Sequence, residues 1–517
     1  MNMIRYCLDR VDDFLNKITM YRVVLYVLIG LLSVAGFMSY LGKLPFSWMD
    51  LALSTGVILG VSLLVNKVFV DAFSAPANVE SVYITALILA LIVSPVKTGQ
   101  LLSPAGLPFL VWVAVWAMAS KFVFAIRKKH LFNPAAFAVA LTSLTISQSA
   151  TWWVGTAVMA PFAFLGAFLI IRKTVRTDLA LSFFAAAFAS VISAALMRGL
   201  NPALTIEKVL LQSPILFFAG VMLTEPLTMP PTKELRVAYG VLIGVLFSPY
   251  AHIGGFYPTP EIALLAGNLF AYLVSPKQKY VLTLSEKIPL TLDTYEFSFT
   301  PDQKMKFNPG QYLEWTLRHE KPDARGNRRY FTIASSPEEQ NVKLGIKFYE
   351  RSSSFKRAML SLAPGDTVVA AQRAGDFVLP RNKDTKLAFL AGGIGITPFR
   401  SMIKHLVDAN EQRPITLVYS NKTKADIVYQ DVFDQAKERL GIRTAYTLTD
   451  AQTIPADWQG YRGPIDSYIL TKEIPDYRSR MFYVSGPHGF VSGMQDLLRR
   501  MGVPERQVKT DFFPGFA

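Results

Sequence analysis

Ala391-Gly-Gly-Ile-Gly-Ile-Thr-Pro398 directly follows the apolar, strand-like run Lys386-Leu-Ala-Phe-Leu390. Glycines lack Cβ atoms, so a glycine loop after a strand lets the backbone approach a dinucleotide, although such a loop alone is weak evidence. The residues up to about Ser275 consist, in contrast, of long apolar stretches. A nucleotide-binding signature joined to a multi-span membrane segment indicates redox chemistry at a bilayer.

The composition separates two unlike halves. Hydrophobic residues make up 51% of the 517 residues and charged residues only 18%, unlike an ordinary soluble protein. Before Ser275 the charges lie between apolar stretches, whereas from Lys277 onward they recur every few positions and no apolar stretch could span a bilayer. We therefore place a boundary at Pro276.

Charge and cysteine content exclude some classes of function. The excess of 53 Lys+Arg over 38 Asp+Glu lies largely in short loops between apolar segments, so membrane orientation explains it better than a nucleic-acid partner does. The one cysteine, Cys7, excludes a protein-held iron-sulfur cluster, which normally needs four thiolates, and any internal disulfide. We expect no metal site.

Ten apolar segments predict an α-helical polytopic membrane bundle at 21–276, after a cytoplasmic segment at 1–20. The segments are 22–41, 49–70, 80–94, 106–126, 131–147, 154–171, 178–197, 207–223, 236–251 and 260–275. Crossing a ~30 Å hydrocarbon core takes ~20 helical residues. Segments 80–94 and 131–147 are therefore expected to be half-helices or tilted pieces buried in the bundle.

Basic residues predict the orientation of the bundle. With both termini in the cytoplasm, the inner loops hold Lys67, Arg127, Lys128, Lys129, Arg172, Lys173, Arg176, Lys233, Arg236, Lys277 and Lys279. The outer loops hold only Lys43, Lys97, Arg198 and Lys208. This bias predicts a multi-pass protein of the plasma (inner) membrane, with its C-terminal half where nicotinamide nucleotides are found.

Polar, proline-containing turns interrupt the short segments, as in Val93-Ser-Pro95, Leu131-Phe-Asn-Pro134 and Leu223-Thr-Glu-Pro226. Broken helices at membrane depth often line a site, although Pro and Asn also cap helices at an interface. Glu80 and Glu225 lie near such breaks, and an acidic group near hydrocarbon is costly unless it is paired or used. These acidic residues favour a functional role for the breaks.

The second half predicts two further domains. From Tyr280 to about Pro380, short alternating runs separated by turn residues are typical of a small antiparallel β-barrel, and we assign 277–382 to it. From Lys386 onward, strand-like runs alternate with helical ones, which predicts an α/β domain with a parallel sheet at 383–517.

Arg328-Arg-Tyr-Phe-Thr332 and the preceding Pro309-Gly-Gln-Tyr312 lie in the barrel region. They resemble the ferredoxin-NADP reductase superfamily, whose flavin motif is Arg-x-Tyr/Phe-Ser/Thr. The resemblance implies an NAD(P)H-dependent, FAD-containing oxidoreductase in which Arg329 pairs with the FAD pyrophosphate. Phe331 would pack on the isoalloxazine and the catalytic Thr332 would face the flavin N5. The other flavin-site residues that it implies are Gln311, Tyr312 and Tyr330.

Four more elements follow in the order of that superfamily. In Ser352-Ser-Ser354, the backbone at Ser353 and Ser354 would hold a phosphate at a helix start. Gly392, Gly393, Gly395, Thr397 and Pro398 would form the nicotinamide-side loop. Ser485-Gly486-Pro487 replaces the family's Cys-Gly-Pro, which puts the catalytic role of Ser485 in doubt. The aromatic tail ending at Phe516 would cover the flavin. Lys422 and Lys424 leave NADH versus NADPH open.

Histidine content argues against haem in the first half. Two bis-histidine haems need four imidazoles inside helices, and only His130 and His252 lie before residue 276, both in predicted loops. We therefore expect no haem.

Phe132-Asn-Pro-Ala135 and Thr224-Glu-Pro-Leu-Thr228 instead resemble turns in the B and D membrane proteins of the sodium-translocating NADH:quinone reductase and of the Rnf complex. This resemblance implies FMN or riboflavin in the bundle, with Asn133, Thr224, Glu225 and Thr228 as candidate contacts. Relatives often carry FMN on the Thr of a Ser/Thr-Gly-Ala-Thr motif. Gln148-Ser-Ala-Thr151 matches only in part, so covalent FMN at Thr151 and a plain polar loop are both considered.

These observations predict that cytoplasmic NAD(P)H reduces FAD and that electrons then pass through a membrane flavin. A quinone, ferric iron or an extracytoplasmic flavoprotein would accept them, with the lipid bilayer as a partner. One alternative is a redox-driven sodium or proton transporter, with Glu80 and Glu225 near the ion path. Another is a membrane-anchored flavin or quinone reductase without transmembrane electron transfer.

Overall fold

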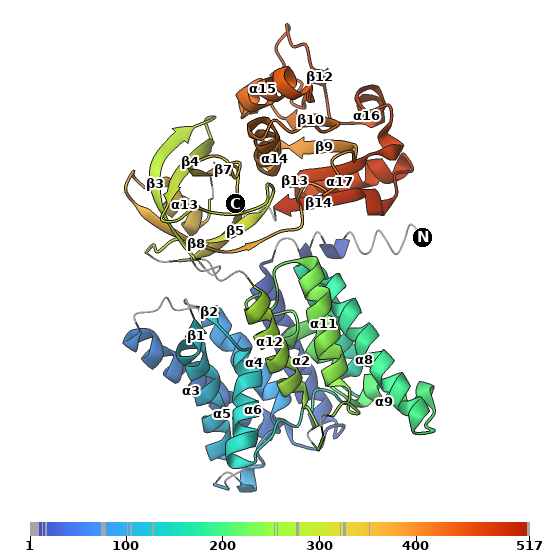
Figure 1. The fold of residues 1–517 in the computed structure, drawn as a ribbon. Helices are drawn as coiled ribbons and strands as arrows, with labels where there is room; N and C mark the ends of the chain where they lie inside the picture. The colour runs from blue at the N-terminus through green and yellow to red at the C-terminus, as the bar shows by residue number, and fades with distance from the viewer. Residues whose placement is uncertain are drawn as a thin grey trace. The chain divides into compact units, whose positions relative to one another are not determined.

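The computed structural model describes residues 10–513 except 13, 16–17, 74–78, 101, 104–105, 127–128, 253, 256, 276–278, 321, 324–326 and 351. The chain divides into two compact units, Met1–Ser275 and Pro276–Ala517, and Figure 1 colours the ribbon by residue number. Each unit has its own apolar core.

The first unit is helical. Its helices are α2 (Met20–Tyr40), α3 (Trp48–Ala72), α4 (Val79–Ile92), α5 (Leu107–Val123), α6 (Pro134–Ile146), α7 (Ala160–Thr174), α8 (Thr177–Met197), α9 (Pro202–Gln212), α10 (Ile215–Phe217), the π-helical turn η2 (Phe218–Met222), α11 (Lys233–Phe247) and α12 (Pro260–Val274). Two short strands, β1 (Ala125–Ile126) and β2 (Lys129–His130), pair between α5 and α6.

Only three described helices, α2, α3 and α8, are long and apolar enough to cross a membrane, and the pair α9 with Ile215–Met222, bent by 67°, would be a fourth. The prediction of ten spans is therefore wrong for the described part of the chain. The other apolar helices end too early: α4 has 14 residues and α6 has 13. At ~1.5 Å per residue they are ~20 Å long, less than a ~30 Å hydrocarbon core. Asn133-Pro134 starts α6 and Ser94-Pro95 follows α4, so these breaks shorten the segments.

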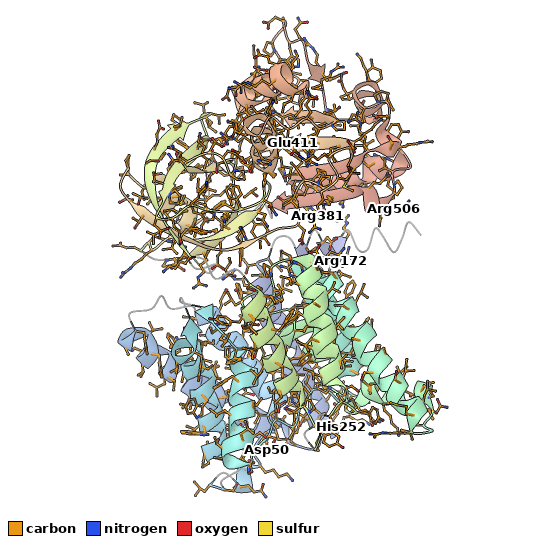
Figure 2. The ribbon with its side chains drawn as sticks, in the orientation of Figure 1. Asp50, Arg172, His252, Arg381, Glu411 and Arg506 are labelled. Atoms are coloured by element: carbon orange, nitrogen blue, oxygen red, sulfur yellow. The ribbon has the colours of Figure 1, made fainter. Side chains whose placement is uncertain are left out.

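Polar contacts tie the ends of the helical unit. At one end, the Asp50 carboxylate on α3 accepts hydrogen bonds from the backbone N–H (3.0 Å) and hydroxyl (2.8 Å) of Thr98. At the other end, Arg172 on α7 pairs with Asp12 through Nε at 2.5 Å and Nη2 at 2.7 Å. Figure 2 shows Asp50 and Arg172 at these opposite ends.

Small residues let helices in this unit approach closely. A Cβ built on Gly244 of α11 would lie 2.5 Å from the carbonyl oxygen of Phe183 on α8, and one on Gly240 would lie 2.2 Å from the Ser182 hydroxyl. Backbone approach of this kind needs glycine because any side chain would separate the helices.

The second unit begins with a six-stranded antiparallel sheet of order β6-β5-β8-β3-β4-β7. Its elements are β3 (Tyr280–Pro289), β4 (Thr294–Pro301), β5 (Tyr312–Thr316), β6 (Arg328–Thr332), β7 (Val342–Lys347), α13 (Ser354–Leu360) and β8 (Thr367–Ala374). Alternate residues point inward, so Phe297, Phe299 and Trp315 are fully buried in its core. The predicted small antiparallel β-barrel is confirmed.

A parallel sheet of order β12-β11-β10-β9-β13-β14 follows. Its elements are β9 (Leu387–Gly392), α14 (Thr397–Asp408), β10 (Ile415–Asn421), α15 (Gln430–Leu440), β11 (Arg443–Leu448), β12 (Tyr461–Arg462), α16 (Ser467–Glu473), β13 (Met481–Pro487), α17 (His488–Arg500) and β14 (Val508–Phe513). The predicted α/β domain is confirmed. β9 lies between β10 and β13, so its carboxyl end is a topological switch point, where such folds bind ligands.

Candidate functional site

The predicted flavin residues of β5 and β6 lie side by side. The strands pair antiparallel with Tyr312 opposite Thr332. The rings of Tyr312 and Tyr330 meet edge to face with centroids 5.6 Å apart. Gln311 and Thr332 are buried, whereas Phe331 is half-buried. Strand pairing therefore joins two motifs that are separated in the sequence.

Arg329 and the serine turn meet at one carboxylate. The Arg329 guanidinium donates to Asp323 Oδ1 at 3.0 Å and lies over the Phe355 ring, 5.4 Å from its centroid. The other carboxylate oxygen of Asp323 accepts from the backbone N–H of Ser354 at 3.3 Å. The Ser353 hydroxyl caps α13 instead. Because a carboxylate and a phosphate carry negative oxygens alike, these donors fit the anionic part of FAD.

Asp323 and His319 were not predicted as members of this cluster. The Asp323 N–H donates to the Ser354 hydroxyl at 2.9 Å, and His319 Nε2 lies 3.1 Å from the same oxygen. Both residues belong to the connection between β5 and β6, where a polar residue carries no local signal. Only the fold brings them to α13.

The glycine loop lies at the carboxyl end of β9, against the end of β13. A Cβ on Gly395 would lie 2.5 Å from the Cα of Gly486 and from the carbonyl oxygen of Ser485, so this contact requires glycine. Gly393 has φ of +52° and open space where a Cβ would be. Gly392 packs on the Phe490 ring. The turn thus exposes bare backbone that fits a dinucleotide.

Ser485 stands beside this loop, paired with Ala391 across β9 and β13. Its side chain is fully buried, and its hydroxyl has no hydrogen-bond partner among the described residues. Pro487 ends β13, immediately after Gly486. A buried hydroxyl without a partner is unfavourable, so Ser485 is a candidate contact for a bound nicotinamide nucleotide.

Thr397 and Pro398 begin α14, where proline suits the first helical turn. The Thr397 hydroxyl donates to the carbonyl oxygen of Ile394 at 3.3 Å. Its methyl group faces the barrel, 2.9 Å from the Cβ position of Gly345 on β7. The nicotinamide-side loop therefore contacts the barrel directly. Phe516 lies outside the described residues.

In the helical unit, the predicted residues Asn133 and Thr228 both contact the predicted Glu225, and His130 contacts Glu225 as well. Glu225 Oε1 lies 3.0 Å from His130 Nε2, and Glu225 Oε2 accepts from Asn133 Nδ2 at 2.9 Å and from the Thr228 hydroxyl at 3.0 Å. Asn268 on α12 joins the group, because its Oδ1 accepts from the backbone N–H of Asn133 at 2.8 Å. This set of five residues is called the Glu225 cluster.

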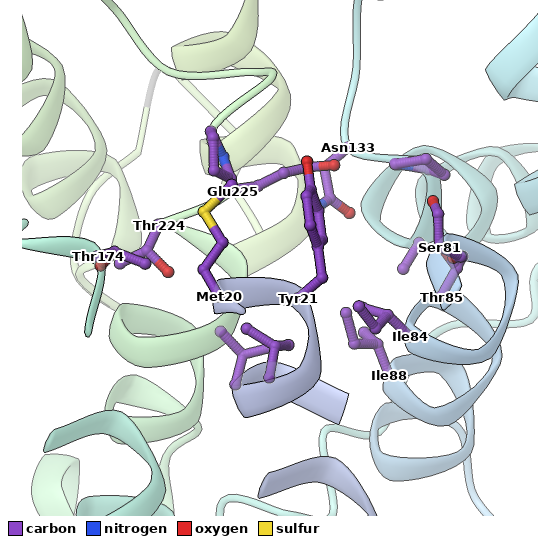
Figure 3. Close-up of a pocket in the computed structure, with 15 residues that line it drawn as sticks. Met20, Tyr21, Ser81, Ile84, Thr85, Ile88, Asn133, Thr174, Thr224 and Glu225 are labelled. Carbon is purple, nitrogen blue, oxygen red and sulfur yellow. The ribbon is translucent and has the colours of Figure 1, made fainter. Parts of the chain in front are cut away.

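The Glu225 cluster borders a cavity of about 60 Å3 (Figure 3). Asn133, Thr224 and Glu225 line it together with apolar side chains and with Tyr21, Ser81, Thr85 and Thr174. The Thr224 hydroxyl, however, donates to the carbonyl oxygen of Gly220 at 2.7 Å. Thr151 is not a lining residue, and its hydroxyl lies 2.9 Å from that of Ser94.

His130 and Asn268 were not predicted as part of this cluster. Asn268 also donates to Tyr239 Oη at 3.1 Å, and Asn268 and Tyr239 are both fully buried within apolar helices. A polar side chain inside an apolar segment is a signal that could have identified Asn268. His130 carries no such signal, because it follows a run of basic residues in the sequence.

Comparisons with known proteins concern the second unit. The oxidoreductase NAD-binding domain family matches residues 389–496. The chain is 26% identical over 227 residues to the glycine betaine monooxygenase reductase subunit of Pseudomonas aeruginosa, covering 43% of this chain and 61% of that protein. It is 23% identical over 247 residues to flavohemoprotein A of Dictyostelium discoideum, covering 44% and 59%.

A third relative is a component of the Na(+)-translocating NADH-quinone reductase of Yersinia pestis, 29% identical over 202 residues, covering 36% of this chain and 49% of that protein. The chain thus spans between 49% and 61% of the length of these relatives. The second unit of this protein therefore carries an oxidoreductase NAD-binding domain and is similar to reductase proteins, which supports an oxidoreductase that uses FAD and a nicotinamide nucleotide.

Proposed function

We propose that the protein is a membrane-bound oxidoreductase that moves electrons from NAD(P)H through FAD to a flavin in the helical unit. FMN or riboflavin is the proposed second flavin, and a quinone, ferric iron or an extracytoplasmic flavoprotein is the acceptor. The proposal includes cytoplasmic termini and a plasma (inner) membrane location.

Different residues of the second unit have different proposed roles in binding FAD and the nucleotide. Arg329 and the backbone N–H of Ser354, which now contact the Asp323 carboxylate, would hold the pyrophosphate, while Phe331 and Thr332 would orient the flavin ring. Gly392 to Gly395 and Ser485 would bring the nicotinamide against it. Bound FAD supplies the chemistry that accepts a hydride and releases electrons one at a time.

The Glu225 cluster is the observation that carries the membrane part of this proposal. A carboxylate inside an apolar helical unit is costly, and Glu225 is held by three side chains at the edge of a cavity. A simple anchor needs no such cluster. Apolar walls with a few convergent polar groups are typical of ligand-binding sites.

Glu80 favours a second candidate, a redox-driven sodium or proton transporter. Arg22 Nε pairs with Glu80 Oε1 at 3.1 Å, and Ser81, the next residue, lines the same cavity as Glu225. Two acidic groups near one cavity could form part of an ion path. Sodium-dependent turnover in sealed vesicles would favour this candidate. Turnover that is indifferent to sodium and moves no protons would remove it.

Flavin extraction tests the main proposal. Detergent-purified intact protein is compared with residues 277–517, and the released and protein-bound flavins are identified by mass. We expect FAD in both samples and FMN or riboflavin only in the intact chain. A mass increase on a peptide containing Thr151 would indicate covalent FMN there. FAD alone, in equal amount in both samples, would contradict the relay and support a membrane-anchored reductase.

A further inference from the structure

The connection from β6 to β7, residues 333–341, directly follows the flavin-motif residue Thr332. Two of its polar members are buried although they lie between strands: Ser335 and Ser336 are at most 1% exposed. The hydroxyl of Ser335 accepts from the backbone N–H of Lys343 at 3.1 Å, which folds the connection back on β7. Any contact that fixes the position of this connection therefore also fixes the end of β6, which carries the flavin motif and is called the flavin strand.

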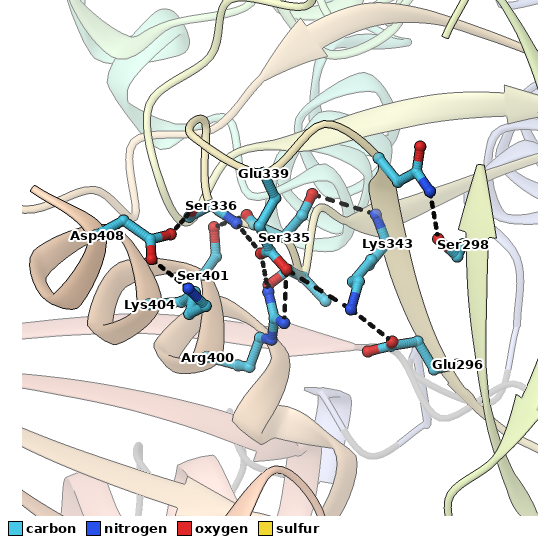
Figure 4. Close-up of polar contacts among 12 residues, drawn as sticks. Glu296, Ser298, Ser335, Ser336, Glu339, Lys343, Arg400, Ser401, Lys404 and Asp408 are labelled. Carbon is cyan, nitrogen blue, oxygen red and sulfur yellow. Dashed lines mark hydrogen bonds and ion pairs between the residues drawn. The ribbon is translucent and has the colours of Figure 1, made fainter. Parts of the chain in front are cut away.

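Helix α14 holds it. This helix begins at Thr397, directly after the glycine loop, and its Arg400 is only 3% exposed. Arg400 Nη1 donates to the carbonyl oxygen of Ala334 at 3.1 Å, and Nη2 donates to Glu339 Oε1 at 2.9 Å. Nη1 also contacts Glu339 Oε2, so the carboxylate is gripped by both arms of the guanidinium. Figure 4 shows this ion pair between the barrel and α14.

Two serine contacts run beside the ion pair. The Ser401 hydroxyl donates to the carbonyl oxygen of Ser335 at 2.6 Å. The Ser336 hydroxyl donates to Asp408 Oδ2 at 2.6 Å, one helix length away from the glycine loop. The contacts thus follow the length of α14 and do not form a single pivot (Figure 4).

Glu339 is also held from the barrel side. Lys343 Nζ lies 3.6 Å from Glu339 Oε1 and 3.1 Å from Glu296 Oε1 on β4. Burial would raise the pKa of Glu339, but the hydrogen bonds and charge of Arg400 keep it below its ordinary value. The carboxylate is therefore ionised at neutral pH, and removing Arg400 would leave a partly buried charge without its main partner.

Close packing at β7 supports the same alignment independently. A Cβ on Gly345 would lie 2.7 Å from the Tyr429 hydroxyl and 2.9 Å from the Thr397 methyl group. Tyr429 has φ of +60°, a strained backbone conformation that persists only where surrounding contacts impose it. Its ring centroid lies 5.5 Å from Arg400 Cζ. The barrel, the glycine loop and Arg400 therefore form one tightly packed junction.

We propose that the Arg400–Glu339 ion pair sets the position of the nicotinamide-side loop relative to the flavin strand, which makes Arg400 a positioning residue for hydride transfer. This inference rests on the proposed reduction of FAD by NAD(P)H, in which the nucleotide loses a hydride and FAD gains it. The rate of hydride transfer depends on a short distance between the donor and acceptor atoms and on their alignment. A misplacement of about 1 Å far from the chemistry can cost ~100-fold in rate.

The test uses detergent-purified full-length protein and measures anaerobic reduction of FAD by stopped flow, with whichever nucleotide reduces the wild type. The nucleotide deuterated at nicotinamide C4 gives the isotope effect. The variants are Arg400→Gln, Glu339→Gln and Arg400→Lys. Arg480→Gln is the matched control, because among the described residues Arg480 bonds only within the α/β domain, to Asp476 at 2.6 Å and to two backbone carbonyl oxygens.

We expect Arg400→Gln and Glu339→Gln to slow hydride transfer ~10- to 100-fold with an altered isotope effect. The half-saturating nucleotide concentration and FAD content should change little, and Arg480→Gln should match the wild type. Arg400→Lys keeps the charge but loses the fork, so its rate should be intermediate. If Arg400→Gln does not fold, Arg400→Lys and Glu339→Gln decide the question.

Rates and isotope effects like the wild type in the folded variants would overturn the proposal, even if the unfolding temperature fell, because the pair would then be merely structural. A wild-type protein whose FAD neither nucleotide reduces would remove the proposed function, and this inference with it. The two failures are therefore distinguishable.

Discussion

Ser485 shows how a single residue links structure to binding. Its hydroxyl is buried without a partner among the described residues, and an unsatisfied buried hydroxyl costs ~1–3 kcal/mol. Ser485→Ala should therefore leave the unfolding temperature of nucleotide-free protein unchanged or raise it. If nucleotide binding supplies the missing partner, the variant should also bind NAD(P)H roughly twofold to twelvefold more weakly, from the ~0.5–1.5 kcal/mol of one hydrogen bond.

Ser401→Ala is the matched control for Ser485→Ala. Ser401 is also fully buried, but its hydroxyl donates to the carbonyl oxygen of Ser335 at 2.6 Å, so its removal should destabilise the protein by ~1 kcal/mol. Thermal unfolding and nucleotide titration measure both variants. A Ser485→Ala protein that loses as much stability as Ser401→Ala would show that the Ser485 hydroxyl already has a partner.

Glu339 predicts an acid sensitivity of the second unit. The folded-state pKa of Glu339 lies below its ordinary value of 4.5, chiefly because Arg400 outweighs the effect of burial. The stability that it contributes is thus fully present above about pH 4.5 and is lost as the pH falls through the folded pKa. Urea unfolding followed by FAD release should show this loss in the wild type.

Glu339→Gln should remove that part of the acid dependence, because glutamine does not titrate. Other carboxylates with lowered pKa values, such as Asp426 and Glu411, remain in both proteins, so only the difference between the two profiles reports Glu339. Parallel pH profiles would contradict the assignment.

At the scale of elements, some glycines lie where two helices pack closely, and others lie on helix faces that no neighbouring atom contacts. A Cβ on Gly244 of α11 would lie 2.5 Å from a backbone oxygen of α8, whereas Gly36 of α2 has nothing within 4 Å of its Cβ position. Gly244→Ala should therefore separate α8 from α11 and lower stability by ~1–3 kcal/mol. Gly36→Ala should be neutral or stabilising by up to ~1 kcal/mol, from helix propensity alone. Thermal unfolding in detergent compares them, and equal effects would contradict this packing.

Sequence patterns predicted the kinds of element better than their lengths. The alternation of runs after Lys386 was enough to predict the parallel sheet, because buried strands and amphipathic helices differ in period. The helical unit was harder. Apolar runs such as 80–94 look like spans, yet α4 ends at Ile92, before Ser94-Pro95. Hydropathy reports what a segment buries, and it does not report where proline ends a helix.

The sequence also predicted some residues of the candidate sites and missed others. Motif residues such as Arg329 and Gly395 could be named, because their chemistry requires a residue type at a fixed spacing. Asn268 shows a polar side chain inside an apolar segment, but its partner could not be named, since Asn133 lies in a distant segment and reaches it only after folding. Glu339 and Arg400 likewise lie in different domains of the second unit. Partners that meet only in three dimensions leave no mark on a local pattern.

At the scale of the whole molecule, the two units should carry separable activities. The first unit holds the Glu225 cluster, and the second holds the residues proposed to bind FAD and the nucleotide. Glu225→Gln removes the charge that faces His130 and turns an acceptor into a partial donor beside Asn133, so binding at the cavity should fail. Glu207 on α9 is exposed, and Glu207→Gln is the matched control.

Both variants are measured with two acceptors, ferricyanide, which takes electrons from FAD directly, and a short-chain quinone in detergent or vesicles. Glu225→Gln should reduce ferricyanide at a rate within ~2-fold of the wild type but lose more than ~10-fold with the quinone, because the buried groups around Glu225 lose their carboxylate acceptor, which costs ~1–3 kcal/mol. Flavin extraction should show FMN or riboflavin lost and FAD retained. Equal loss with both acceptors would mean that Glu225 only stabilises the protein. Full activity with both would mean that electrons reach the acceptor without passing the Glu225 cluster.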